Sequence, residues 1–206
     1  MYARSTTVHA DPQRIDEGIA YVRDEVMPAV QSMPGCMGLS MLGDRDSGRC
    51  IVTTSWDSEE SMSASREAVR AMRERAVDVM GGQFDVQEWE IAVLHRAHRA
   101  PEGACCRVTW TRGDPARMDD MAETFRTGLV PRLDEIEGFC SVSVMGDRQT
   151  GMSVLTATYD DRGSLDRSAE AVRGMREQFT QQMGLEITDM AEFELVIHHL
   201  RVPEMV

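Results

Sequence analysis

The chain has no lysine and no asparagine among its 206 residues, and arginine accounts for all 22 of its basic side chains. The absence of lysine excludes a Schiff-base enzyme, a P-loop nucleotide site and a Ser-Lys catalytic dyad, because each depends on a lysine amine. The absence of asparagine removes that carboxamide as a group that could position a substrate or an oxygen intermediate. Any chemistry must therefore use other polar side chains.

Acidic residues outnumber basic ones, because 35 Asp and Glu residues against 22 Arg residues give the chain a net charge of −13. This balance argues against a nucleic acid or an anionic membrane as a partner, because phosphate groups are bound by basic patches. The sequence contains no run of about 18 apolar residues, the length that a transmembrane helix requires. The segment Met1–Ser5 lacks the apolar stretch of a signal peptide. We therefore expect a cytoplasmic protein.

The five cysteines form no CxxC pair. We expect them to be buried free thiols, as in proteins of a reducing compartment. Cys105 and Cys106 are neighbours that would point to opposite faces of a strand, so the cysteines predict no metal site.

The sequence matches itself when it is shifted by 103 residues, without a gap from Arg4 to Glu74. A one-residue insertion then aligns the last segments of the two copies. We interpret the chain as a tandem duplication with domains at residues 1–97 and 104–206. The matching pairs include Asp11 with Asp114, Pro28 with Pro131, Gly35 with Gly138, Gly48 with Gly151, and Glu67–Arg70 with Glu170–Arg173.

Each copy predicts the element order strand, helix, two strands, helix, strand. An Asp-Pro pair starts the first helix of each copy, with Asp as N-cap and Pro at the first helical position. Apolar residues three to four apart mark one face of that helix, and a glycine ends it. The expected strands are 2–9, 37–43, 49–56 and 86–95 in the first copy, with 105–112 and 189–199 in the second, and the second helices are 59–79 and 163–183.

This order is that of the ferredoxin-like fold, an α+β fold with both helices on one face of an antiparallel sheet. In a single copy the other apolar face would meet water, at a cost of about 25 cal/mol per Å². We therefore predict two βαββαβ repeats packed sheet to sheet as an intramolecular dimeric α/β barrel. The predicted pseudo-dimer is compatible with assembly of several chains into a homo-oligomer.

Two short segments of the first copy resemble a known family. Thr53–Ser61 reads TTSWDSEES and runs from a predicted strand into a helix, and Pro34–Gly38 reads PGCMG at the end of the preceding helix. Both are similar to segments of the antibiotic biosynthesis monooxygenase (ABM) domains of the dimeric α/β-barrel superfamily. The second copy keeps Gly138 and Asp160, but it has Tyr159 where the first has Trp.

The resemblance implies either a cofactor-independent oxygenase of quinol-like polyketides or a haem-degrading enzyme. The haem-degrading branch uses an Asn on the first strand, a Trp, and a His ten residues after that Trp. Here the Asn is absent, and Arg66 and Ala169 stand ten residues after Trp56 and Tyr159. We therefore expect no cofactor, and haem binding through His95 or His199 remains a minor hypothesis.

The resemblance also makes Trp56 a candidate wall of a substrate pocket. The structural alternative is a large side chain that closes the gap between sheet and helix at the end of a strand. Tyr159 takes the same place in the second copy, so the two pockets should differ.

Arg4 and Arg107 occupy equivalent positions on the first strands of the two copies. An arginine within a small sheet is costly unless it is paired or faces a wet cavity. One interpretation is a pair of structural ion pairs, Arg4–Glu90 and Arg107–Glu194, across neighbouring strands. The other is a charged anchor for a phenolate, quinol or carboxylate substrate, a role that suits the fixed fork of arginine.

Two compositional features have a simple structural interpretation. The 16 methionines predict core filling, or else an adaptable apolar pocket for a flat aromatic ligand. The charged second helix of the first copy, which carries Arg66, Arg70 and Arg73, predicts a solvated face with ion pairs three and four residues apart.

The favoured hypothesis is a small-molecule protein of the ABM group that acts as a cofactor-independent monooxygenase on a quinol, phenolic or polyketide-type aromatic. The alternative is a non-catalytic module that binds or senses a small aromatic ligand. No residue is assigned a catalytic role. The candidate substrate-binding residues are Trp56, Arg4, Thr6, His9, Tyr159 and Arg107.

Overall fold

The computed structural model describes residues 1–200 and 202–205, with the backbone alone described at Leu200. The chain divides into two compact units. The first unit contains Met1–Trp89 and Glu194–Val202, and the second contains Glu90–Phe193 and the segment that begins at Pro203. Two of the three boundaries fall inside long strands. The copies at 1–97 and 104–206 are instead defined by sequence similarity, and that division into domains stays a prediction.

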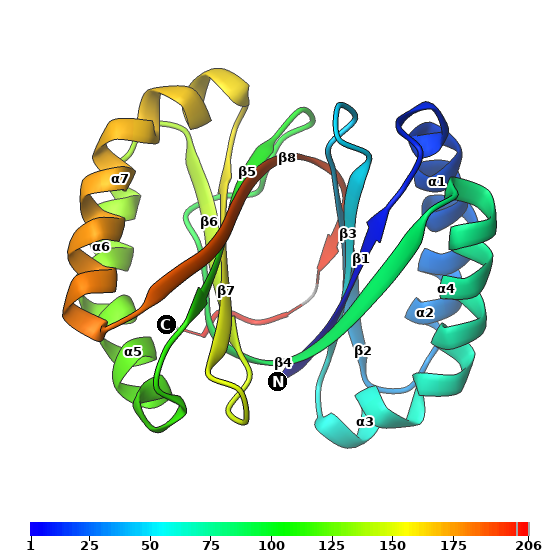
Figure 1. Ribbon diagram of the computed structural model, residues 1–206, viewed down its shortest axis with the longest axis horizontal. Helices are drawn as coiled ribbons and strands as arrows, with labels where there is room; N and C mark the ends of the chain where they lie inside the picture. The colour runs from blue at the N-terminus through cyan, green and yellow to red at the C-terminus, as the bar shows by residue number, and fades with distance from the viewer. Residues whose placement is uncertain (201, 206) are drawn as a thin grey trace. The chain divides into compact units, whose positions relative to one another are not determined.

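In the first unit the elements follow the predicted order of strand, helix, two strands, helix and strand (Figure 1). The helices α1, α2 and α4 lie against one face of the strands. Their bounds are β1 Tyr2–His9, α1 Ile15–Tyr21, α2 Met27–Gln31, β2 Cys36–Gly43, β3 Arg49–Trp56, α3 Glu59–Ala64 and α4 Arg66–Met80, followed by β4 Gln83–Arg96.

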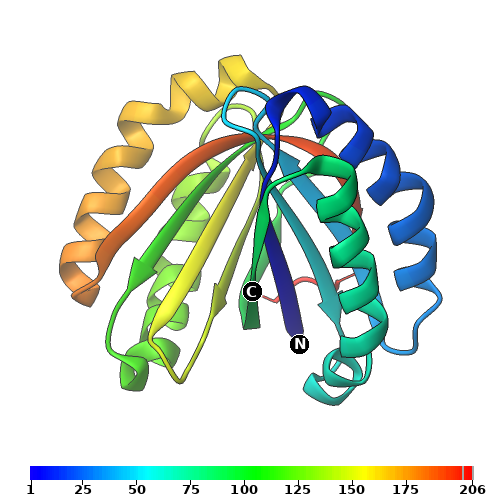
Figure 2. The same cartoon turned by 45° about the vertical axis from the view of Figure 1, so that its right-hand side comes forward.

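The second unit repeats this order, as Figure 2 shows from another side. Its second helix is continuous, whereas the first unit divides the same helix into α3 and α4. The bounds are β5 Cys105–Arg112, α5 Met118–Thr124, α6 Val130–Asp134, β6 Phe139–Gly146, β7 Met152–Tyr159, α7 Arg162–Met183 and β8 Glu186–Leu200.

The first helix of each copy is interrupted by one π-helical turn, which the apolar spacing did not predict. The turns cover Val22–Val26 and Phe125–Leu129. Pro28 and Pro131 stand in the first turn of the α-helices that follow. A proline lacks the N–H group and clashes with the preceding turn, so the helix must restart around it.

The strands of the first unit pair in the order β1-β3-β2, and β2 then pairs with the second half of β8. The registers place Tyr2 opposite Trp56 and Leu39 opposite His199. All these pairs are antiparallel. In the second unit β5-β7-β6 pair in the same way, and β6 pairs with the second half of β4.

The hydrogen-bonded order of the eight strands closes on itself as β1-β3-β2-β8-β5-β7-β6-β4. This closed order, with the ferredoxin-like element order in each copy, confirms the predicted class of dimeric α/β barrel. The strands β4 and β8 are longer than predicted because each pairs with two different strands along its length. No helix among the described residues is both long and apolar enough to span a membrane.

Each unit has its own apolar core between helices and strands. Trp56 is fully buried in the first core, and Tyr159 is fully buried at the same place in the second. Cys50 and Cys106 are buried free thiols, and burial raises the pKa of Cys50 to about 11 and that of Cys106 to about 12. These two thiols therefore stay protonated at neutral pH.

Gly138, which ends the first helical region of the second copy, is held in a left-handed conformation with φ of +80°. A Cβ atom there would lie 2.4 Å from the Ser164 Oγ atom. We expect Gly138→Ala to lower the free energy of unfolding by about 1–3 kcal/mol, measured by urea denaturation.

Gly174 is the matched control, because it lies within α7 and nothing would lie within 4 Å of its Cβ atom. Gly174→Ala should stabilise the protein by about 0.5–1 kcal/mol. Equal effects at Gly138 and Gly174 would contradict the strain at Gly138.

Candidate functional site

A cavity of about 80 Å³ lies inside the second unit, between its helices and the β5-β7 strands. Its wall is mostly apolar, with polar groups concentrated on β5, β7 and α7. The apolar lining consists of Met121, Phe125, Leu129, Leu133, Val144, Leu155, Ala157, Val172, Met175, Phe179 and Leu185, and the polar lining of Arg107, Thr109, Thr111, Ser153, Arg176 and Thr180.

Arg107 brings a charge to this wall from β5. Its side chain is only 7% exposed. Its Nε and Nη2 atoms donate to Glu192 Oε1 at 3.1 and 2.9 Å, and Nη2 also donates to the Leu165 carbonyl at 3.3 Å. The Nη1 atom is buried and has no hydrogen-bond partner among the described residues. A buried donor without a partner costs about 1–3 kcal/mol, more for a charged group, so this atom is suited to receive a ligand oxygen.

Arg176 brings a second cation to the same cavity from α7. Its Nε atom is also buried without a partner among the described residues. Burial lowers the pKa of Arg176, and the positive charge of Arg107 lowers it further. Glu192 is shared between two arginines. Its Oε1 atom pairs with Arg107, and its Oε2 atom accepts a hydrogen bond from Arg162 Nη1 at 2.6 Å. The cavity therefore has an excess of positive charge, which favours an anionic ligand.

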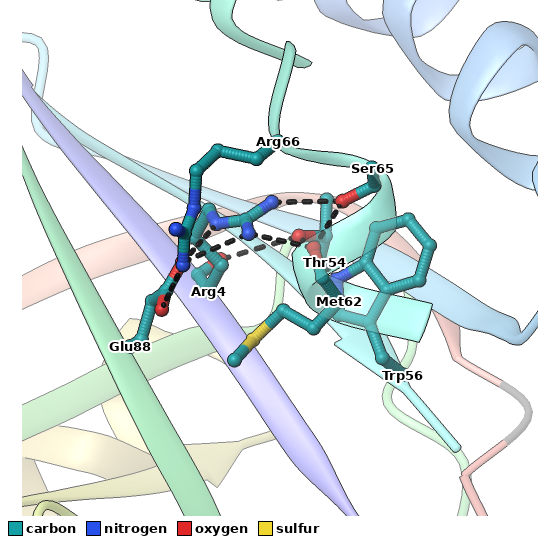
Figure 3. Close-up of polar contacts among 7 residues, drawn as sticks. All are labelled: Arg4, Thr54, Trp56, Met62, Ser65, Arg66 and Glu88. Atoms are coloured by element: carbon teal, nitrogen blue, oxygen red, sulfur yellow. Dashed lines mark hydrogen bonds and ion pairs between the residues drawn. The ribbon is translucent and has the colours of Figure 1, made fainter. Parts of the chain in front are cut away.

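Arg4 occupies the corresponding position in the first unit, where its contacts are more complete (Figure 3). Its Nε atom donates to Glu88 at 2.9 Å, Nη1 to the Ser65 hydroxyl at 2.8 Å and Nη2 to the Met62 carbonyl at 2.7 Å. The side chain is 2% exposed. Each nitrogen of Arg4 thus has a partner within the protein, so Arg4 holds α3 and β4 to β1.

The cavity beside Arg4 has a volume of about 30 Å³. Arg4, Thr6 and Arg73 are among its lining residues. Arg73 has buried Nε and Nη1 atoms without partners among the described residues, while its guanidinium carbon lies 6.0 Å from the centre of the Phe84 ring. A space of this size is far below the cavity of about 150 Å³ that holds benzene. The first cavity is therefore too small for an aromatic ring.

Trp56 and Tyr159 do not line these cavities, although each was a candidate wall. The Trp56 indole Nε1 donates to the Thr54 hydroxyl at 3.1 Å (Figure 3). Tyr2 is the residue opposite Trp56 on β1. The Tyr159 hydroxyl makes no hydrogen bond of normal geometry among the described residues. Burial raises the pKa of Tyr159, and the nearby Ser168 side chain opposes this rise. Both side chains fill the core at the end of a strand, as the structural alternative described.

His9 lies apart from Arg4 and Thr6. It ends β1 with an exposed side chain, and its Nε2 atom is 3.9 Å from the Asp85 carboxylate. Side chains alternate between the two faces of a strand, so a residue five positions after Arg4 points to the opposite face. Thr6 is on the cavity side with Arg4.

The ion pairs of the first strands use a different glutamate in each copy from the one predicted. Arg4 pairs with Glu88 instead of Glu90, and Arg107 pairs with Glu192 instead of Glu194. The outer glutamates pair with hairpin arginines, Glu90 with Arg148 and Glu194 with Arg45. The prediction placed the pairs on the right strands, but the register along β4 and β8 shifts each contact by two residues.

The sequence interpretation missed Arg73 and Arg176 as cavity residues. Arg73 was assigned to a solvated helix face and Arg176 was not singled out, yet both are only partly exposed and line the cavities. A signal was present, because each directly follows a methionine, Met72 or Met175, that also lines its cavity.

Comparison with known proteins now places the chain in a family. A family model for antibiotic biosynthesis monooxygenase matches residues 1–75. Two uncharacterised proteins of Mycobacterium tuberculosis (strain ATCC 25618 / H37Rv), Rv2557 and Rv2558, are each 45% identical over the whole chain. The alignments cover 92% and 88% of these relatives. The chain belongs to the ABM family, which confirms the resemblance seen in its sequence.

Solved structures share the fold over nearly the whole chain. An anthrone oxidase-like protein aligns with a TM-score of 0.67 and 14% identity, covering 99% of this chain and 94% of its own. A ferredoxin fold protein from Listeria monocytogenes 4b F2365, related to antibiotic biosynthesis monooxygenases, aligns with a TM-score of 0.56 and 6% identity, covering 95% and 94%. Such low identities show a common fold and leave the activity to the site itself.

Proposed function

We propose that this protein is a cofactor-independent monooxygenase that binds a small phenolate or quinol anion in the cavity of the second unit. The observation that carries the proposal is the buried Nη1 atom of Arg107, a cationic donor without a partner that belongs to the wall of an apolar cavity. A ligand oxyanion would accept this hydrogen bond and satisfy the donor. Arg176 adds a second positive charge beside the same ligand.

In the proposed reaction the protein binds the substrate, favours its ionised form and excludes water. The two cations lower the pKa of a bound phenol, so that it ionises, and the electron-rich anion then transfers an electron to O₂. One oxygen atom enters the ring, and the other leaves as water with the two hydrogens that the substrate loses. The substrate supplies all the electrons, so no external reductant is required. The apolar wall excludes water from this reaction.

The size of the cavity favours a single ring. A cavity of about 150 Å³ holds benzene, whereas this one measures about 80 Å³. A one-ring phenolate therefore requires a modest displacement of the wall, which Met121 and Met175 can provide because methionine side chains are flexible. A tricyclic anthrone, the compound class in the name of the anthrone oxidase-like neighbour, requires a larger opening.

The test is oxygen uptake by the metal-free protein with hydroquinones, catechols and anthrones. We expect uptake that requires the protein, is larger for one-ring substrates and falls at least tenfold in Arg107→Met. Trp56→Phe, in the other unit, is the matched control and should keep the activity. Uptake that is unchanged in Arg107→Met would contradict the proposed site.

The second candidate function is binding of the same anion without catalysis. One observation favours it: among the lining residues that the structure describes, there is no histidine, cysteine or carboxylate that could act as a general base. Tight binding of a phenolate without oxygen uptake across the panel would support this candidate. Both candidate functions assume a cytoplasmic protein and a small aromatic ligand.

A further inference from the structure

Three potential metal ligands of different chemistry meet in the second unit, on residues other than those of the cavity. A ring nitrogen of His98, the Sγ atom of Cys140 and a carboxylate oxygen of Asp160 all lie within 4.8 Å of one another. The Asp160 Oδ1 atom is 2.7 Å from His98 Nε2 and 3.2 Å from Cys140 Sγ. Cys140 is buried, whereas the side chains of His98 and Asp160 are 46% and 36% exposed, so a metal ion could reach the cluster from solvent.

The backbone holds these three side chains in place from three separate segments. His98 follows β4, Cys140 is in β6, and Asp160 directly follows β7. The Cys140 carbonyl accepts hydrogen bonds from Ala97 N at 2.8 Å and from His98 N at 3.3 Å. The Asp160 N atom donates to the Gly138 carbonyl at 2.8 Å. The donors are therefore preorganised by main-chain contacts, which lowers the entropy cost of binding an ion.

The cluster is particular to the second copy. The corresponding residues of the first copy are Met37 and Asp57, so the carboxylate is retained and the thiol is not. Asp57 instead accepts a hydrogen bond from the Ser58 hydroxyl at 3.0 Å. The second copy thus has a soft sulfur donor beside a carboxylate, with an imidazole from the segment that connects the copies.

We propose that His98, Cys140 and Asp160 form a Zn²⁺ site with an open fourth position for water. Thiolate, imidazole and carboxylate are the three kinds of side chain that bind zinc, and three protein ligands plus water complete a tetrahedral shell. On binding, the Cys140 thiol gives its proton to solvent, and His98 coordinates through Nε2 with its proton on Nδ1. The His98–Asp160 separation must widen from 2.7 Å to about 3.3 Å, as bond lengths near 2.0 Å at tetrahedral angles require.

This site is independent of the proposed oxygenase cavity. A bound ion would tie the segment between β4 and β5 to the ends of β6 and β7. At a free zinc concentration 100-fold above the dissociation constant, linkage and the size of the chain predict a rise in melting temperature of about 5–10 °C.

The test uses the full chain, stripped of metal with a chelator and kept reduced. Titration with Co²⁺ should give one site per chain and a thiolate-to-cobalt charge-transfer band, and Zn²⁺ should displace the cobalt. We expect Cys140→Ala to abolish the band and His98→Ala to weaken binding at least tenfold. Cys50→Ala, which removes a buried thiol from the first unit, is the matched control and should bind as the wild type does.

His98 is partly exposed, so His98→Ala should fold even if a substitution at Cys140 does not. Absence of the band in the wild type would overturn the proposal. A band that persists in Cys140→Ala, or unchanged affinity in His98→Ala, would also overturn it, because the ion would then be bound elsewhere.

Discussion

Replacement of Arg107 by methionine is expected to lower the affinity for a small phenolate about 10- to 100-fold, the effect of losing one charge-assisted hydrogen bond in a dry cavity. Methionine keeps much of the length of the arginine stem but has no donor for the ligand. The probe is 4-nitrophenolate, a one-ring anion whose absorbance reports binding, titrated at a pH where it is ionised. Glu192 keeps its contact with Arg162 in this variant, which limits the loss of stability.

Arg4→Met is the matched control for this prediction. In the first unit the substitution removes the hydrogen bonds of Arg4 to Ser65 and to the Met62 carbonyl, whereas Glu88 keeps its contact with Arg66. We expect it to lower the free energy of unfolding by about 1–3 kcal/mol, the cost of losing buried hydrogen-bond partners, and to leave phenolate affinity within twofold. An equal loss of affinity in both variants would mean that the second cavity is not the binding site.

Trp56→Ala is expected to have the largest effect on stability, a loss of about 3–5 kcal/mol in the free energy of unfolding. The indole is fully buried, and its Nε1–H donates to the Thr54 hydroxyl, so truncation leaves a large cavity and removes one of the two hydrogen bonds of that hydroxyl. Globular proteins are stable by only about 5–15 kcal/mol, so this is a large share of the total. Urea denaturation followed by far-ultraviolet circular dichroism measures it.

Tyr159→Phe is the corresponding control in the second unit. The ring stays in the core, where it packs edge-to-face on Phe139, and the hydroxyl that is removed makes no hydrogen bond of normal geometry among the described residues. We expect a change within about 0.5 kcal/mol in either direction. A loss as large as that of Trp56→Ala would show that the hydroxyl has a polar role.

Much of the fold follows from local patterns. The strands predicted at 2–9 and 105–112 coincide with β1 and β5. Each is a short run of residues, and an Asp-Pro helix start follows it. The hairpin strands and the second helices agree within a few residues. The π-helical turns were not predicted, because they arise where Pro28 and Pro131 compete with the helical hydrogen bonds. The length of β4 and β8 depends on strand partners that are distant in sequence.

The candidate site was only partly predictable. The sequence identifies Arg4 and Arg107 as equivalent, and nothing in their local sequence distinguishes a saturated arginine from one with an unpaired nitrogen. Side-chain contacts made across the fold create that difference, because Arg4 reaches Ser65 through Nη1 and Arg107 has no such contact. Arg176 was missed for a related reason, since a long side chain on a charged helix face can fold back over an apolar wall.

By itself, the sequence determined the duplication, the order of elements and the ABM family, because these depend on repeated residues and on periodic patterns along the chain. Only the tertiary structure decided that the second copy carries the larger cavity and that Arg107, unlike its counterpart Arg4, keeps an unpaired nitrogen. It also brought together His98, Cys140 and Asp160, which three separate segments supply. The reason is that cavity volume and hydrogen-bond saturation depend on how distant side chains pack, and two similar sequences can fill the same fold differently.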